Sequence, residues 1–253
     1  MMLRRLVGLV LIVLFAALAG GCVDNTSLPP IETDSLPGSD SPSDVILPPA
    51  DAGSSVGTEY PVRIVVTADF GEQVLSEETV VVREDTNALD ALQQVANVAT
   101  KYGGGFVSSI GGISSEYGGT NRQKKDWFFY LNGISVNTGA GSYLLHPGDI
   151  EHWDYRDWSF RQFVPAIVGD FPEPFLHGYG GKVYPTVVAY QDGWEEAARL
   201  VADRLEELGV ENIACRGLEE LAEADRESSN LVLLGTSEFK PIKELNEPWT
   251  VSY

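Results

Sequence analysis

Cysteine, histidine and basic residues are all scarce in this 253-residue chain. It has two cysteines and three histidines, and its 17 Lys and Arg stand against 37 Asp and Glu, which gives a formal net charge of −20. So acidic a surface repels the phosphates of nucleic acids, which argues against DNA or RNA as a partner. We interpret the acidity as a solvated surface that keeps the protein soluble.

The chain also lacks an apolar run long enough to cross a bilayer. Its apolar run from Leu6 to Leu18 has 13 residues, whereas a spanning helix needs roughly 20. Arg4 and Arg5 precede this run, and Ala19-Gly20-Gly21 follows it. A basic start, a short apolar core and a site of small residues predict a secretory signal peptide over residues 1–21, in preference to a permanent transmembrane anchor.

Cys22 follows these small residues directly. The arrangement resembles the lipobox of bacterial lipoproteins, in which the cysteine is acylated and becomes the first residue of the mature chain. The resemblance implies an extracytoplasmic protein held to the bacterial membrane by lipid on Cys22, through acyl burial of about 0.8 kcal/mol per methylene. Cys215 then has no partner for a disulfide, and its apolar stretch predicts a buried small hydrophobe.

Basic residues are absent from the segment that follows. Residues 23–60 contain six prolines, seven acidic residues and no Lys or Arg. Such a composition buries too little apolar area to offset the entropy of ordering. We therefore predict a lipidated, disordered tether over residues 22–59.

Alternating apolar residues predict an α+β domain over residues 60–160. Strands are expected at 62–68 and 79–83, joined by a hairpin through Asp69-Phe70-Gly71. Thr86 is the expected N-cap of a helix with apolar residues from Ala88 to Ala99. Short strands follow at 106–107 and 110–113, then an aromatic strand at 127–131 closed by Asn132-Gly133, and strands at 143–145 and 150–155. This order suggests a β-grasp-like fold.

The pattern changes to alternating strands and helices after a linker at residues 161–183. Strands are expected at 186–190, 210–215 and 230–234, with helices at 194–208 and 218–224 and a C-terminal cap at Gly209. Such alternation predicts a small α/β domain with a parallel sheet over residues 184–253. Three strands make a modest core, which leaves two alternatives: a truncated domain or a sheet that docks on the first domain.

The aromatic strand belongs to a recognisable series of motifs. Asp126 to Gly133 is followed by Gly139 to Tyr143, by Pro147-Gly148-Asp149-Ile150, and by Trp153 and Tyr155. Over about residues 60–158 the chain resembles the bacterial transcobalamin-like C-terminal domains, named for the β-domain of transcobalamin and intrinsic factor. In those carriers the domain covers one face of a corrinoid and a helical domain covers the other. The resemblance implies a corrinoid (cobalamin) as ligand, its second face covered by the α/β segment or by an uptake transporter.

Broad aromatic side chains suit a flat, partly apolar ligand. Alternation places Trp127 and Phe129 on one face of their strand, where core packing and ligand contact are both open interpretations. Four more aromatic residues lie near strand ends and are candidate ligand contacts: Tyr143, Trp153, Tyr155 and Trp158.

Metal and catalytic motifs are missing. The three histidines show no metal-ligand spacing. His177, in a Gly-rich link, is the best placed to ligate the cobalt of a corrinoid, although a surface or turn role is the simpler interpretation. No nucleophile elbow, metalloprotease helix or Walker loop occurs, so we expect a protein that is not an enzyme. Two functions fit: a lipoprotein that binds a small molecule for uptake, or a non-catalytic module that binds an envelope partner.

Overall fold

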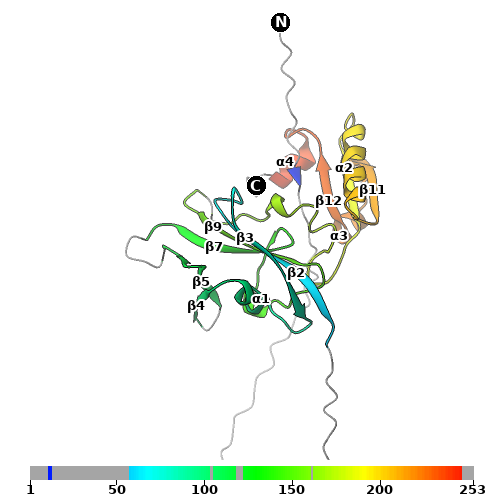
Figure 1. Cartoon of the computed structure of the whole chain (residues 1–253). Helices are drawn as coiled ribbons and strands as arrows, with labels where there is room; N and C mark the ends of the chain where they lie inside the picture. The colour runs from blue at the N-terminus through cyan, green and yellow to red at the C-terminus, as the bar shows by residue number, and fades with distance from the viewer. Residues whose placement is uncertain (1–10, 13–56, 103–104, 118–121, 161, 247–253) are drawn as a thin grey trace, which may run out of the picture. The chain divides into compact units, whose positions relative to one another are not determined.

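The computed structural model describes residues 11–12, 57–102, 105–117, 122–160 and 162–246 (Figure 1). Cys22, the predicted signal peptide apart from residues 11–12, and nearly all of the predicted tether lie outside the described residues. The described chain has a mixed α/β architecture with several sheets, two of which contain parallel strands. This confirms the predicted mixture of helices and sheets, whereas the boundaries between domains stay predictions.

A five-stranded sheet with the order β3-β2-β9-β7-β8 forms the larger part. Its strands are β2 (Glu59–Ala68), β3 (Gln73–Arg83), β7 (Lys125–Leu131), β8 (Ile134–Ser135) and β9 (Ile150–Asp157). The central strand β9 runs parallel to β2 and antiparallel to β7. The predicted hairpin through Asp69-Phe70-Gly71 joins β2 to β3, and Asn132-Gly133 joins β7 to β8, with positive φ at all five turn residues.

Helix α1 spans Ala88–Val95 and begins one residue later than predicted. Asn87, not Thr86, is the N-cap, because its side-chain oxygen accepts a hydrogen bond of 2.9 Å from the backbone N–H of Asp90. The predicted extension to Ala99 is also wrong. Ala96 is extended, and the chain continues into β4 (Val98–Lys101), which pairs with β5 (Phe106–Ile110) and through it with β6 (Ile113–Ser114).

The strand predicted at residues 143–145 does not form. Ala140–Ser142 is a 3₁₀ turn (η2), and Leu144 makes only an isolated bridge to Asn87. Tyr143 and Leu145 are nevertheless buried, in the core that the sheet and helix α1 share.

The two faces of the five-stranded sheet differ in character. One face joins α1 in an aromatic and aliphatic core. The other face carries Thr67, His152, Asp154 and Arg156, all of them buried. Residues 162–178, predicted as a flexible link, cover this polar face. The segment includes the 3₁₀ turn η3 (Val168–Asp170), and the hydroxyl of Tyr130 donates to the carbonyl of Val164 at 3.1 Å.

A second sheet has the order β1-β12-β10-β11. Its strands are β1 (Leu11–Ile12), β10 (Thr186–Tyr190), β11 (Ile213–Gly217) and β12 (Asn230–Leu234), and β10 runs parallel to both β11 and β12 as predicted. Helix α2 (Glu195–Glu207) packs against this sheet (Figure 1). It is followed by a 3₁₀ turn, η4 (Leu218–Glu220), and by the helices α3 (Glu223–Ser228) and α4 (Lys240–Asn246).

Helix α2 ends in the predicted glycine motif. The N–H of Gly209 bonds the carbonyl of Glu206 at 2.9 Å, and the N–H of Val210 bonds that of Leu205 at 3.0 Å. This Schellman arrangement needs the φ of +93° that Gly209 adopts. The prediction for Cys215 is wrong. Strand β11 starts three residues later than expected and lies at the edge of its sheet, and the thiol is exposed.

Candidate functional site

An aromatic cleft is built by the pairing of β7 with β9. Phe129 lies opposite Trp153 in the register, and Trp127 lies opposite Tyr155. The rings of Phe129 and Trp153 stack with centroids 4.7 Å apart and planes at 16°, and those of Trp127 and Tyr155 are 5.2 Å apart at 49°. Cross-strand aromatic pairs of this kind stabilise a sheet and hold the rings in fixed orientations.

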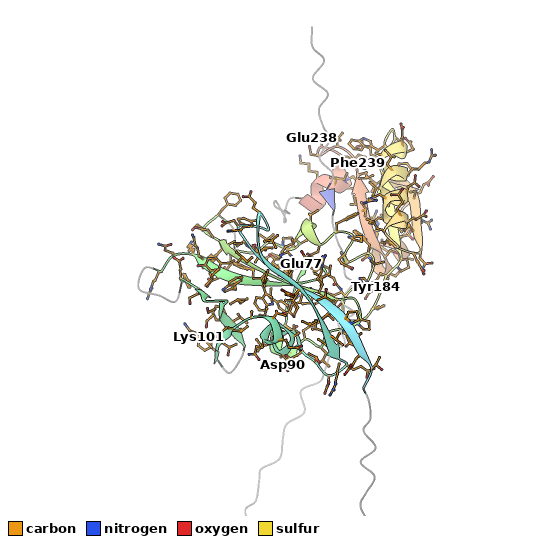
Figure 2. The ribbon with its side chains drawn as sticks, viewed as in Figure 1. Glu77, Asp90, Lys101, Tyr184, Glu238 and Phe239 are labelled. Carbon is orange, nitrogen blue, oxygen red and sulfur yellow. The ribbon has the colours of Figure 1, made fainter. Side chains whose placement is uncertain are left out.

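The rings of Trp127, Phe129 and Trp153 line an open cleft of about 200 Å³. The β5 strand and the segment after β8 complete its walls with Phe106, Val107, Val136 and Thr138. The lining also includes the backbone of Gly105 and Gly139. The side chains of the sheet are drawn in Figure 2. Apolar rings and exposed backbone groups suit a flat ligand edge.

Three of the six predicted aromatic residues line this cleft: Trp127, Phe129 and Trp153. Trp127 and Trp153 are also core residues, with 6% and 4% of their surface exposed. The core interpretation of Trp127 is confirmed, whereas ligand contact stays a prediction. Phe129 is only partly buried and is the most accessible of the three.

The other three predicted residues lie outside the cleft. The Tyr155 ring is tilted against Trp127, and its hydroxyl lies within hydrogen-bond distance of Glu116 Oε1, at 3.0 Å, and of the Ser114 carbonyl, at 3.1 Å. Trp158 donates from its indole to Asp126 at 2.7 Å and packs on Tyr117. Tyr143 is buried, and its hydroxyl accepts from the N–H of Gly180 at 3.0 Å.

His177 does not have the freedom that its Gly-rich surroundings suggested. Its Nδ1 is bonded to Glu173, whose second oxygen accepts from the backbone N–H of His177 at 2.9 Å. The ring also packs on Gly148 so closely that a Cβ there would lie 2.3 Å from it. His177 is not part of the cleft lining, and among the described residues no cluster of three or more His, Cys, Asp or Glu could hold a metal ion.

Glu151 is a residue of the site that the sequence analysis missed. It is fully buried on β9, and the indole N–H of Trp153 donates to its Oε1 at 2.6 Å. Burial is the main reason why the pKa of this carboxyl is raised to about 8, so the group is mostly protonated at neutral pH. A neutral Glu151 therefore fixes the Trp153 ring that forms one wall of the cleft. The sequence contained one signal for this role: Glu151 stands two residues before Trp153 and therefore lies on the same, inward face of β9.

The family comparison concerns the segment that holds the cleft. Residues 85–157 match the model of a family described as a domain of unknown function (DUF4430). This part of the chain is therefore similar to that family. Every residue that lines the cleft, from Gly105 to Trp153, lies within the matched DUF4430 segment.

Two solved structures are similar to parts of the chain. One is haptocorrin in complex with Cbi, with 15% identity over 40% of this chain and a TM-score of 0.32. The other is a protein of Ruminococcus gnavus ATCC 29149 described as a candidate metal-binding protein, with 16% identity over 39% of this chain and a TM-score of 0.30. This chain spans about a quarter of the haptocorrin chain, 26%, and 97% of the R. gnavus chain. No curated protein gives a significant match.

Proposed function

We propose that the chain is a small-molecule-binding lipoprotein whose ligand edge enters the cleft between Trp127, Phe129 and Trp153. The observation that carries this proposal is the stacked Phe129–Trp153 pair, which lines an open cleft although the Trp153 ring is itself largely buried. Side chains that serve only to pack the core are close-packed and leave little empty volume beside them. Binding is also the function that the described residues suit better than catalysis, and we expect no enzymatic activity.

The size of the cleft limits the manner of binding. Pockets that enclose drug-sized ligands have roughly 300–1,000 Å³, whereas this one has about 200 Å³. A corrinoid, the ligand implied by the sequence resemblance, could therefore insert only one edge or rest one face on the rings. We propose that its other face is covered by a second protein, such as an uptake transporter, and that the domain has a β-grasp-like arrangement for presenting the ligand.

The cellular location that we propose is argued from the N-terminal sequence. The basic, apolar and small-residue pattern before Cys22 supports export and lipid attachment at that residue. In the described residues no helix has the length and apolarity to span a membrane. We propose an extracytoplasmic protein anchored by lipid on Cys22.

Titration of the full-length protein in detergent with cobinamide and with cobalamin, followed by heat and by visible absorbance, tests the proposal. A cleft-blocking variant, Thr138→Trp, places a large ring at an exposed position of the rim and is expected to weaken binding at least tenfold. Trp158→Ala removes an aromatic ring outside the cleft and is the matched control, with unchanged affinity.

The outcomes separate the two candidate functions. Binding that Thr138→Trp reduces and Trp158→Ala leaves intact supports ligand capture in the cleft. Absence of binding by both compounds refutes the corrinoid ligand. In that case the exposed rings of Tyr102 and Phe160, which have 89% and 79% of their surface accessible, favour the alternative of a non-catalytic module that binds an envelope partner.

A further inference from the structure

A second cavity, of about 130 Å³, lies in the α/β part of the chain. Its lining comes from the ends of three neighbouring parallel strands and the segments that follow them: Tyr190, Gln191 and Asp192 for β10, Leu218 and Glu219 for β11, and Phe239 for β12. Phe239 is labelled in Figure 2. None of the residues that line the aromatic cleft lines this cavity, so the two are separate sites.

The cavity stands at the carboxyl ends of these strands, where the chain leaves the sheet toward opposite faces. Helix α2 follows β10 and packs on one face, against Val188 and Val232. Helix α4 follows β12 and places Ile242 on the other face, with Val187 and Leu231. In open α/β sheets the crevice between two such strands is the usual place for a ligand. The position of the cavity therefore favours a binding site.

Gln191 holds two of the loops at this edge together. Its Oε1 accepts hydrogen bonds from the backbone N–H of Thr236 at 3.0 Å and from the Thr236 hydroxyl at 3.3 Å. Gly235 makes this approach possible, because a Cβ at that position would lie 2.9 Å from Gln191 Oε1. The loop after β12 is thereby fixed against the loop after β10, so the walls of the cavity are formed in advance of a ligand.

The lining combines aromatic rings with carboxylates that a ligand can reach. Tyr190 and Phe239 are half-buried, and each supplies a ring. Asp192 and Glu219 are exposed, and neither carboxylate has an ion pair or hydrogen bond within the described part of the chain. No Lys or Arg is among the described residues that line the cavity. The site thus has two uncompensated negative charges beside apolar rings.

We propose that this cavity binds a small organic cation with a methylated ammonium group, its charge beside the two carboxylates and its methyl groups against the two rings. Carboxylates attract the charge, and aromatic side chains bind quaternary ammonium groups through cation–π attraction. The methyl surface also suits the Leu218 side chain, whereas a bare metal ion needs a cluster of ligands that the described residues do not form. The volume corresponds to about four water molecules, which fits a head group the size of tetramethylammonium.

Isothermal titration of the full-length protein in a non-ionic detergent, with tetramethylammonium and with choline, tests the proposal. 3,3-Dimethylbutan-1-ol has the shape of choline without its charge and is the control ligand. The lining double variant, Asp192→Asn with Glu219→Gln, removes both charges of the site. The control double variant, Glu196→Gln with Glu220→Gln, removes two exposed charges that are close to them in the sequence but do not line the cavity. Phe239→Leu keeps an apolar side chain and removes the ring.

Saturable binding of at least one cation is expected, about tenfold or more tighter than binding of the neutral alcohol. The lining double variant should weaken it about tenfold and Phe239→Leu about threefold or more, with no change in the control double variant. The proposal is overturned if neither cation binds, if the alcohol binds as tightly, or if Phe239→Leu binds as the wild type does. Equal weakening by the two double variants would also overturn it, because the acidic chain as a whole would then attract the cation. All four carboxylates are exposed, so the double variants keep the fold.

Discussion

Substitution of Glu151 by Gln is predicted to stabilise the protein at neutral pH. The carboxyl is fully buried, and its pKa is raised from 4.5 to about 8, mainly by desolvation. Between these two values the folded state binds one proton that the unfolded state has released, so the free energy of unfolding falls as pH rises. A pKa difference costs about 1.36 kcal/mol per unit, and over the interval from 4.5 to 7 the cost is about 3 kcal/mol.

The Gln side chain keeps the favourable contact and removes the titration. Its carbonyl oxygen can accept from the Trp153 indole as Oε1 does, and its amide replaces Oε2, which has no partner within the described ranges. Protonated Glu and Gln each leave one polar atom unpaired, so that cost largely cancels in the comparison. We therefore expect Glu151→Gln to raise the free energy of unfolding by about 3 kcal/mol at pH 7 and by little at pH 4.

Urea unfolding at several pH values between 4 and 8.5, followed by tryptophan fluorescence, measures this difference. Burial also raises the pKa values of Asp149 and Glu173, so the wild-type curve contains their contributions, and only the difference between variant and wild type isolates Glu151. Glu78→Gln, at an exposed position of β3, is the control and should leave the pH dependence unchanged. Parallel pH curves for Glu151→Gln and wild type would refute the assignment of a buried, neutral carboxyl.

Three further predictions concern stability and accessibility. Gly209→Ala should lower the free energy of unfolding by about 1 kcal/mol, because Gly209 has a φ of +93°; thermal denaturation with no shift would contradict this. Asn132→Ala should cost about 2 kcal/mol or more, because this buried amide donates to Asp149 and to Gly178, both at 2.8 Å; the exposed Asn137→Ala is the control, and equal chemical unfolding curves for the two variants would count against the network. Cys215 should react with a maleimide in the folded protein because its thiol is exposed, although desolvation raises the pKa of the thiol and slows the reaction; labelling that requires denaturant would disprove this exposure.

Local signals in the sequence predicted the elements whose patterns are self-contained. The hairpin at Asp69-Phe70-Gly71, the turn at Asn132-Gly133 and the cap at Gly209 each depend on a few adjacent residues with positive φ. The apolar strands β10 and β12 are recognisable because a parallel sheet covered on both faces needs nearly continuous apolar runs.

The features that were mispredicted depend on residues distant in sequence. Tyr143 and Leu145 are buried in the core that the sheet and helix α1 share, and no local pattern distinguishes that position from a strand. The covering segment at 162–178 is rich in Pro and Gly, which indicates a flexible link, yet it packs on the sheet through contacts such as Tyr130 to Val164.

The composition of the aromatic cleft was predictable only in part. Alternation placed Trp127 and Phe129 on one face, but the register of β7 against β9 decides that Trp153 joins them and that Trp158 lies elsewhere. The burial of Glu151 was not predicted, because an acidic residue in a strand normally indicates a solvated face.

The alternation of side chains along β9 also fixes the register of the strands that pair with it. Glu151, Trp153 and Tyr155 face the aromatic core, while His152, Asp154 and Arg156 face the buried polar network. A slip of one residue would exchange the two sets, taking Arg156 away from Asp154 and from the Phe128 ring 3.8 Å away, and placing an indole among the charges. Because β9 pairs with both β2 and β7, such a misalignment would be penalised on two sides at once, and the chain is thereby protected against misfolded sheets that hydrogen bonding alone would tolerate.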